Sequence, residues 1–324
     1  MTWTEVYDTL MAAERIVVVS HPHPDGDAIG SLLGLTNQLR ALGKNVTCAV
    51  DEGVPEFLQF VPGSETVLPT LESGDWDLVV FVDAGDLDRA GEVGAYALAH
   101  APRIVNIDHH PTNPRFGDVA LVVPESASAA EIICELWERV GHTDYGRDVA
   151  VPLLTGMVTD TIGFRTSSTT QRTLELAVKL MQRGASLTEI TARTLDVMDL
   201  DELELWKRVL PRVMVEDQIA YVSVYAADAA SVGMENATDA GIVQFLVRVN
   251  QIMVACVFKE HDGKVRLSLR SKRGYDVASL AKSLGGGGHL QAAGATLYMS
   301  LAEAEALVLP MLRDVVCKGK LEIV

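Results

Sequence analysis

The stretch RIVVVSHPHPDGD, residues 15–27, joins a short apolar run to a polar loop. Its first six residues are rich in β-branched side chains, which predicts a strand that is buried on both faces. The two prolines that follow forbid a helix, so the loop presents His21, Asp25 and Asp27 at the carboxyl end of this strand.

The same order of β-branched run, loop and helical pattern repeats along the first half of the chain. The strand-like runs lie at 15–20, 45–50, 76–84 and 103–108, and the helical patterns lie at 28–42, 127–140, 148–159 and 173–183. Apolar strands that alternate with helices form parallel sheets covered on both sides. Residues 1–186 are therefore predicted to form an α/β domain around a parallel sheet.

The second half of the chain has a different pattern. A charged, mainly helical stretch at 187–213 is expected to link the first domain to a second one over 214–324. Strand patterns lie there at 218–225, 251–259 and 264–271, with His261, Asp262 and Gly263 as a hairpin turn. The predicted fold class is α/β, in which a helix-covered parallel-sheet domain precedes a smaller mixed α/β domain.

The charge of the chain limits its partners. Among 324 residues there are 27 Lys and Arg against 44 Asp and Glu, a net charge of −17. This argues against a long duplex nucleic acid as a partner, because a duplex needs a broad cationic face. Residues 241–290 instead carry eight basic and three acidic residues, a net charge of +5. This local basic face predicts that a small anion binds the second domain.

The sequence shows the pattern of neither a secretory signal nor a membrane-spanning helix. The N-terminal segment carries acids where a secretory signal needs positive charge, and no apolar run is long enough to span a membrane. The four widely spaced cysteines predict neither a disulfide framework nor a zinc site. We therefore expect a soluble, cytoplasmic protein with no membrane partner.

Acids and imidazoles follow two further strands. Asp83 stands at the end of the 76–84 run, and Asp108, His109 and His110 stand at the end of the next one. The carboxyl ends of parallel strands meet at one edge of a sheet, so these side chains are expected to join the 15–27 loop there. Such a mixture of carboxylates and imidazoles suits a divalent metal, particularly manganese.

Each of these residues has a structural alternative when it is taken alone. Asp25 or Asp27 would serve as a helix cap, and an Asp after a strand is often a turn residue. Asp160 ends an apolar helix, where a turn residue is again the simpler interpretation. Only the convergence of several such loops favours a metal site.

A glycine run lies inside the basic part of the second domain. Gly285–Gly288 precede His289, and Arg270 stands a short way upstream. A flexible hinge is one explanation, while exposed backbone N–H groups that a phosphate can approach closely are the other. The basic surroundings favour the phosphate, to which Arg270 and His289 would donate charge-assisted hydrogen bonds.

Taken together, these motifs resemble the DHH phosphoesterase superfamily, which is named for the triplet at 108–110. Four motifs stand in order: HPHPDGD at 21–27, VDAGD at 82–86, DHH at 108–110 and the acid of TDTIGF at 160. GGGGHLQAAGA at 285–295 and RSK at 270–272 look like the DHH-associated domain of the branch that contains NrnA-type oligoribonucleases and pAp phosphatases. Family members often have glycine directly after TDT, whereas here Ile162 precedes Gly163.

The resemblance implies a site with two manganese ions, for which magnesium or cobalt could substitute. One ion would be held by His21, Asp25 and Asp83, and the other by Asp27, Asp83, His109 and Asp160, with Asp83 bridging them. Catalysis would also use His110, which would face the substrate phosphate, and Asp108, which would orient the histidines. The substrate-binding residues of the second domain would be Arg270, Lys272, Gly286, Gly287, Gly288 and His289.

The expected reaction is phosphoester hydrolysis by a hydroxide that the two metals activate. The expected substrates are short 5′-phosphorylated oligoribonucleotides, cut to mononucleotides, and 3′-phosphoadenosine 5′-phosphate (pAp), cut to AMP. A phosphodiesterase of cyclic di-AMP or pApA and a non-catalytic nucleotide sensor stay open as alternatives. A RecJ-type exonuclease would need further nucleic-acid-binding domains, and a family II pyrophosphatase would not need the glycine segment. A homodimer would suit an enzyme of this kind.

Overall fold

The computed structural model describes residues 3–87 and 90–320, so both ends of the predicted domains, 1–2 and 321–324, lie outside the described part. The chain divides into two compact units, Met1–Val197 and Met198–Val324. The division falls inside the predicted linker, between helix α7 (Leu187–Thr194) and helix α8 (Leu200–Val209). The stretch is mainly helical, as predicted. The break between the two helices ends at Asp199, the N-cap of α8, whose backbone N–H donates to Glu202.

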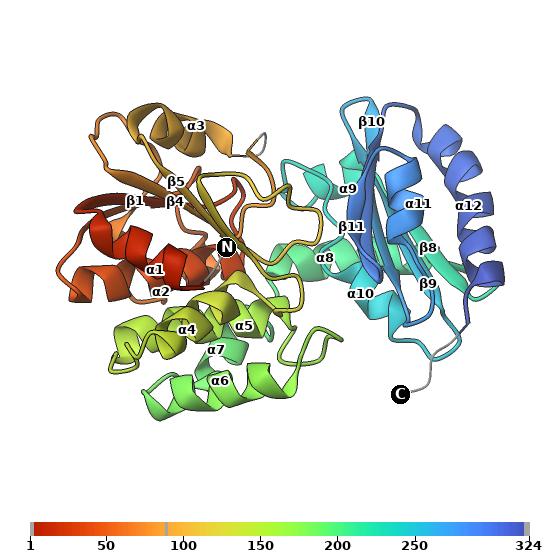
Figure 1. Ribbon diagram of the computed structural model, residues 1–324. Helices are drawn as coiled ribbons and strands as arrows, with labels where there is room; N and C mark the ends of the chain where they lie inside the picture. The colour runs from red at the N-terminus through yellow and green to blue at the C-terminus, as the bar shows by residue number, and fades with distance from the viewer. Residues whose placement is uncertain (1–2, 88–89, 321–324) are drawn as a thin grey trace. The chain divides into compact units, whose positions relative to one another are not determined.

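Six parallel strands form the sheet of the first unit, in the order β3-β2-β1-β4-β5-β6. Figure 1 shows the neighbouring strands β1, β4 and β5. They are β1 (Arg15–Val19), β2 (Asn45–Ala49), β3 (Val67–Leu68), β4 (Leu78–Val82), β5 (Ile104–Asp108) and β6 (Val119–Val122). The predicted parallel sheet is confirmed, although β3 and β6 are too short to stand out in the sequence. The strand order reverses between β1 and β4, which is where open parallel sheets bind their ligands.

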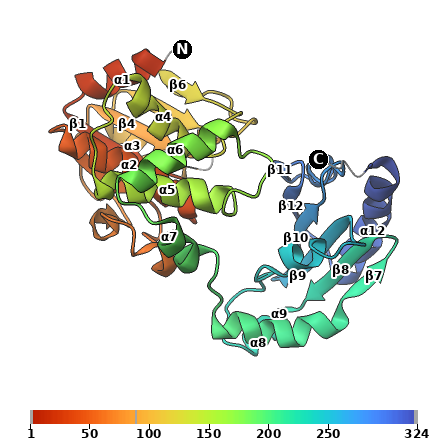
Figure 2. The same cartoon turned by 90° about the horizontal axis from the view of Figure 1, so that it is seen from below.

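Helices cover both faces of this sheet. They are α1 (Trp3–Ala12), α2 (Gly26–Ala41), α3 (Gly91–His100), α4 (Ala129–Arg139), α5 (Arg147–Asp160) and α6 (Gln171–Gln182), followed by α7. Because successive side chains of a strand point to opposite faces, Ile16 and Val18 of β1 join the core under α1, α2, α4 and α5, while Val17 and Val19 join the core under α3. On the first of these faces α2, α4 and α5 pack against one another (Figure 2).

The helices that carry Asp27 and Asp160, α2 and α5, approach each other closely at Gly30. A Cβ atom at this position would lie 2.5 Å from the carbonyl oxygen of Pro152 and 2.7 Å from the backbone nitrogen of Gly156. Such contacts exclude any side chain, so the absence of a Cβ atom at Gly30 sets the separation of the two helices.

The second unit contains a mixed sheet in the order β11-β12-β10-β9-β8-β7, in which β8 and β9 are parallel and the other neighbours are antiparallel. Its strands are β7 (Met214–Glu216), β8 (Ile219–Val224), β9 (Val254–His261), β10 (Lys264–Ser271), β11 (Gly287–His289) and β12 (Ala292–Leu297). The predicted mixed domain is confirmed. The hairpin turn is one residue shorter than predicted, because His261 pairs with Lys264 and only Asp262 and Gly263, both with positive φ, make the turn.

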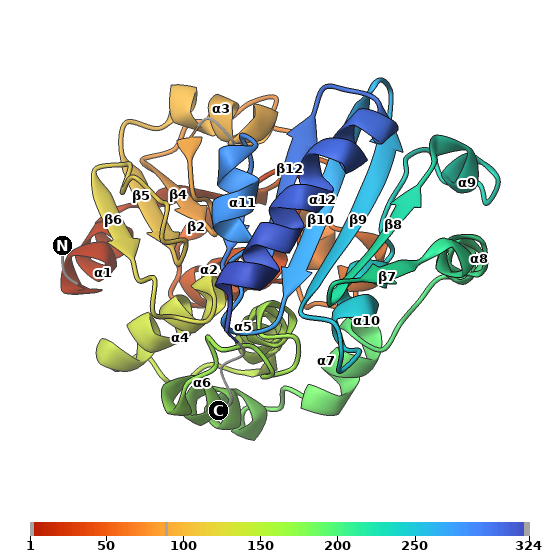
Figure 3. The ribbon, with the colours of Figure 1, turned by 90° about the vertical axis from the view of Figure 1, so that its right-hand side faces the viewer.

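Helices lie over both faces of the second sheet, and Figure 3 shows α11 and α12 on the nearer face. They are α8, α9 (Ala226–Ala230), α10 (Ile242–Val247), α11 (Ala278–Ser283) and α12 (Leu301–Lys318). Leu267 and Leu269 of β10 share a core with α11 and α12, whereas Ala255 and Val257 of β9 share another with α8, α9 and α10. No helix in the described part of the chain combines the length and the apolar character needed to cross a bilayer.

Candidate metal centre

The loop after β1 places two of the predicted ligands beside Asp83. Asp25 is the N-cap of α2, and its Oδ1 accepts hydrogen bonds of 3.0 Å from the backbone N–H groups of Asp27 and Ala28. The Nδ1 of His21 donates to the carbonyl oxygen of its neighbour Pro22 at 2.9 Å, and its Nε2 lies 3.5 Å from Asp83 Oδ2. This is the usual arrangement of a ligating histidine, with one nitrogen fixed by a carbonyl and the other turned to the site. Asp25 therefore caps a helix and also lies at the site.

Asp27 is almost completely buried in the first turn of α2. Its carboxylate accepts hydrogen bonds from the backbone N–H groups of Ala129, at 2.7 Å, and Ala130, at 3.0 Å, which start α4. Burial, together with the charges of Asp83 and Asp160, raises the pKa of Asp27 well above its usual range. A divalent cation beside these acids would offset the cost of holding them ionised in one buried place.

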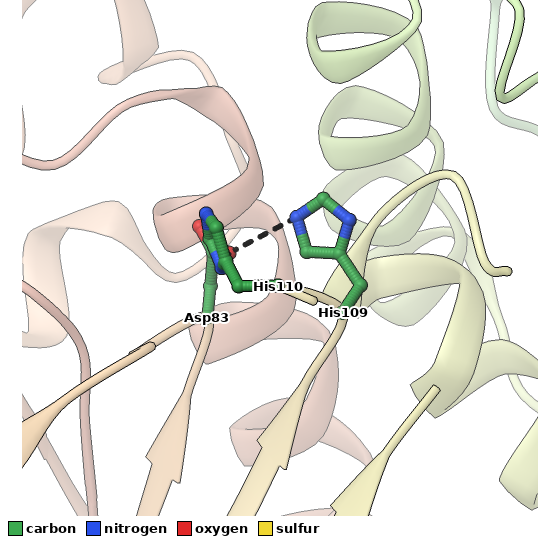
Figure 4. A group of neighbouring side chains, drawn as sticks. All are labelled: Asp83, His109 and His110. Atoms are coloured by element: carbon green, nitrogen blue, oxygen red, sulfur yellow. Dashed lines mark ion pairs between the residues drawn. The ribbon is translucent and has the colours of Figure 1, made fainter. Parts of the chain in front are cut away.

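Asp83 follows β4, and its side chain lies beside those of His109 and His110 (Figure 4). It belongs to two of the three groups of potential ligands. Its backbone has a positive φ of 52°, a conformation that Asp tolerates better than most residues. Its Oδ1 is buried and has no hydrogen-bond partner among the described residues, with His109 Nε2 at 3.5 Å and His110 Nδ1 at 3.8 Å. Burial alone would raise the pKa of Asp83, but contacts with His109 and His21 outweigh it and hold this pKa below its usual range. A buried oxygen without a partner is costly, and a metal ion would satisfy it.

His109 connects Asp83 to two further acids. Its Nε2 lies 3.6 Å from Asp160 Oδ2 and 4.0 Å from Asp27 Oδ2. Burial lowers the pKa of His109, but contact with Asp83 and the charges of Asp27 and Asp160 raise it to about 10. Burial also raises the pKa of Asp160 to about 6, with Asp83 adding to the effect. Asp160 is thus part of the cluster rather than an isolated turn residue.

The potential ligand atoms form three overlapping groups, in each of which all atoms lie within 4.8 Å of one another. The groups are His21, Asp25 and Asp83; Asp27, His109 and Asp160; and Asp83, His109 and His110. All six side chains that the sequence nominated as ligands therefore meet in the first unit. Their nitrogen and oxygen donors are those of a divalent metal site, so the cluster can hold metal ions.

Asp108 is the last residue of β5 and belongs to none of these groups. It is fully buried, and its Oδ1 accepts a hydrogen bond of 2.8 Å from His110 Nδ1. Its Oδ2 accepts one of 2.6 Å from the amide of Asn113, which also lies 2.8 Å from Asn106 Oδ1. Asp108 therefore orients His110, and Asn113 holds Asp108. Neither asparagine was predicted from the sequence, although Asn106 stands out as a polar residue inside an apolar strand.

Arg270 and His289 share one row of the second sheet. Arg270 in β10 and His289 in β11 each lie directly opposite Ala292 in the strand between them. Two strand spacings put their backbones about 10 Å apart. Lys272 lies elsewhere: its ammonium group donates to the carbonyl oxygens of Val249, at 2.9 Å, and Asn250, at 2.8 Å. It therefore fastens the loop after α10, a structural role that the sequence did not indicate.

The glycine run is partly a strand, not the open loop that the sequence suggested, since Gly287–His289 form β11. The backbone N–H of Gly286 donates to the carbonyl oxygen of Ala281 at 2.8 Å, and a Cβ atom at Gly286 would lie 2.1 Å from Gly294 O. At Gly287 a Cβ atom would meet nothing within 4 Å. The expectation that the run offers open N–H groups is therefore wrong at Gly286, where glycine is needed for close packing on β12.

Comparison with known proteins agrees with this geometry. Residues 15–159 match the DHH family, N-terminal domain, and residues 218–316 match the DHHA1 domain. The chain belongs to the DHH family. It is a phosphoesterase. The bifunctional oligoribonuclease and PAP phosphatase NrnA of Thermus thermophilus is 33% identical to it, over 95% of this chain and 93% of that protein.

Two further relatives of this DHH protein are informative. The crystal structure of an exopolyphosphatase-related protein from Bacteroides fragilis is 27% identical and has a TM-score of 0.88, covering 97% of this chain and 96% of that one. The cyclic-di-AMP phosphodiesterase PdeA of Listeria monocytogenes is 26% identical over 97% of this chain, but the match covers only 49% of PdeA.

Proposed function

We propose that this DHH protein is a manganese-dependent hydrolase that cuts short 5′-phosphorylated oligoribonucleotides to mononucleotides and pAp to AMP. The observation that carries the proposal is the convergence of acids and histidines around the unsatisfied buried oxygen of Asp83. The choice of substrate rests on similarity to NrnA proteins along nearly the whole of both chains, whereas PdeA is matched over half of its length.

The donor set suits two manganese ions, because manganese accepts both imidazole nitrogen and carboxylate oxygen. One ion would be held by His21, Asp25 and Asp83, and the other by Asp27, Asp83, His109 and Asp160. Two such ions, when bound, supply a nucleophile from water near neutral pH and stabilise the charge on the attacking and leaving oxygens.

The residues around the metals position the substrate. Asp108 accepts from His110 Nδ1, so Nε2 is the ring nitrogen that faces the reacting phosphate. Burial lowers the pKa of His110, but contact with Asp108 and the charge of Asp83 raise it above its ordinary value, which favours the protonated ring whose Nε2 donates to a phosphate oxygen. A donor aimed at the oxygens where charge develops stabilises the transition state. In the second unit, Arg270 and His289 bind a phosphate of the substrate, and Gly287 leaves room beside them.

The proposal is tested by incubating the purified protein with manganese and pApA, pAp or cyclic di-AMP, and separating the products by chromatography. We expect AMP from pApA and pAp. Asp83→Ala should lower both rates by at least about 1,000-fold, because the metal contribution of several kcal/mol is lost. The matched control is Asp8→Ala, which removes an exposed carboxylate from α1 and should leave the rates unchanged.

Three other results would contradict the proposal. Preference for cyclic di-AMP would make the protein a cyclic-dinucleotide phosphodiesterase. Binding of nucleotides with no turnover of any substrate would make it a sensor. Turnover that survives in Asp83→Ala at more than a small fraction of the normal rate would remove Asp83 from the bridging position.

A further inference from the structure

One face of the second sheet is only half covered. Over β9, this face carries Ala255 and Val257, which are buried under α8, α9 and α10. On β10, directly opposite these two residues, the same face carries Arg270 and Ser268, neither of which is buried. Beyond β10 the face continues over β12 and β11 without any large apolar side chain. The open half of this face, over β10, β12 and β11, therefore has the composition of a ligand-binding surface rather than of a hydrophobic core.

Lys259 reaches onto this open half from β9. It lies directly opposite Arg266, and its ammonium group donates a hydrogen bond of 2.8 Å to Ser268 Oγ. Ser268 is the residue between Arg266 and Arg270 on this face of β10, because side chains on one face recur at every second position. The ammonium group of Lys259 therefore lies between two guanidinium-bearing positions.

These three cations gather without a compensating carboxylate in contact. Within the described part of the chain, none of Lys259, Arg266 and Arg270 forms an ion pair. Burial lowers the pKa of Lys259, the charge of Asp239 raises it, and Arg266 and Arg270 lower it again, so that it lies below its ordinary value. Like charges that cluster in a partly buried place cost free energy, and a bound anion would recover it.

The sheet leaves space for such an anion next to Ser268. The residue opposite Ser268 on β12 is Gly294, and the residue opposite Gly294 on β11 is Gly287. The row formed by Ser268, Gly294 and Gly287 therefore has only one side chain, the hydroxymethyl group of Ser268. The next row on the same face contains Arg270 and His289.

We propose that Lys259, with Arg266 and Arg270, binds the doubly charged terminal phosphate of a nucleotide or short oligonucleotide. The inference rests on the proposed function and deepens it, since it names the feature of the substrate that is selected. A terminal phosphate monoester gains its second charge at a pKa of about 6, whereas an internal phosphodiester carries a single charge. Three cations around one site favour the monoester. The site therefore selects substrates that carry a 5′-phosphate.

The first test compares pApA with ApA, which lacks only the 5′-phosphate. The wild-type protein should prefer pApA. Lys259→Met keeps the length of the side chain and should lower kcat/KM for pApA by about 10- to 100-fold, the value of one charge-assisted hydrogen bond, with less than about threefold change for ApA. Lys259→Arg should keep the preference. The matched control, Lys318→Met, removes an exposed charge from α12 and should change neither value. Equal losses on both substrates, or no loss, would overturn the proposal.

The second test is independent of turnover. AMP is titrated calorimetrically into metal-free protein, with adenosine as the ligand that lacks the phosphate. The wild type and Asp83→Ala should bind AMP equally, and Lys259→Met should bind it about 10- to 100-fold more weakly. This result would stand even if pApA and pAp were not hydrolysed, in which case the proposed function alone would fail. Unchanged binding in Lys259→Met, or no binding of AMP by the wild type, would overturn the phosphate site whether or not hydrolysis is observed.

Discussion

The two units bring their functional side chains together in different ways. In the first unit, the candidate ligands stand at the ends of strands and helices, and the parallel topology collects them at one edge of the sheet. In the second unit, Lys259, Arg266 and Arg270 stand inside strands, and the antiparallel register places them on one face. Functional residues at strand ends lie close together in the sequence and form short motifs. Functional residues on a sheet face are single residues in separate strands, and they can be recognised as a group only when the pairing of the strands is known.

Beyond the ligands themselves, a large effect is expected where the strand-end cluster depends on buried support. Asn113→Ala removes the donor to Asp108 Oδ2 and should lower kcat by roughly 10- to 100-fold, with KM changed by less than about threefold, because His110 loses its fixed orientation. Steady-state kinetics on pApA measures both constants.

The control for this variant is Asn37→Ala. The amide of Asn37 donates to the carbonyl oxygens of Pro62, at 3.0 Å, and Asp148, at 2.7 Å, and lies outside the metal cluster. Asn37→Ala should lower the melting temperature of the protein and leave kcat unchanged. If both variants lowered kcat equally, Asn113 would have no special role in positioning His110.

The contrast between the units explains how much could be predicted. The loop HPHPDGD and the triplet at 108–110 follow apolar strands directly, so their meeting at one edge could be predicted from the sheet type alone. Lys259 and Ser268 are separated by a hairpin that the sequence also indicated. Their contact was missed because it depends on a turn of two residues, and a turn of three residues shifts every cross-strand pair. The contact between Asn113 and Asp108 was missed because it depends on how the two side chains are oriented, which the order of the strands does not determine.

Two residues of the glycine run are expected to contribute differently to the stability of the second unit. Gly286→Ala would place a Cβ atom 2.1 Å from Gly294 O and should destabilise the second unit by about 1–3 kcal/mol, whereas Gly287→Ala should change its stability by less than about 0.5 kcal/mol. Hydrogen exchange of β11 and β12, together with thermal unfolding, measures the difference. If Gly287→Ala were as damaging as Gly286→Ala, close packing on β12 would not explain the run.

The smallest effect is expected in the loop after Asp160. Ile162 has a φ of 50°, a left-handed conformation that is unfavourable for a β-branched residue and natural for glycine. Ile162→Gly should therefore be more stable than Ile162→Ala by about 1 kcal/mol, because both variants lose the same contacts of the larger side chain and only glycine relieves the backbone. Urea unfolding measures this difference. An alanine variant as stable as the glycine variant would show that the backbone at Ile162 carries no strain.

The central claim is that the strand-end cluster of the first unit holds two metal ions around Asp83. Its most direct test is anomalous diffraction at the manganese edge from crystals grown with manganese. Our account predicts two peaks about 3.5–4 Å apart, both in contact with the carboxylate of Asp83. A single peak bound by His21 and Asp25 alone, or no peak beside Asp83, would contradict it.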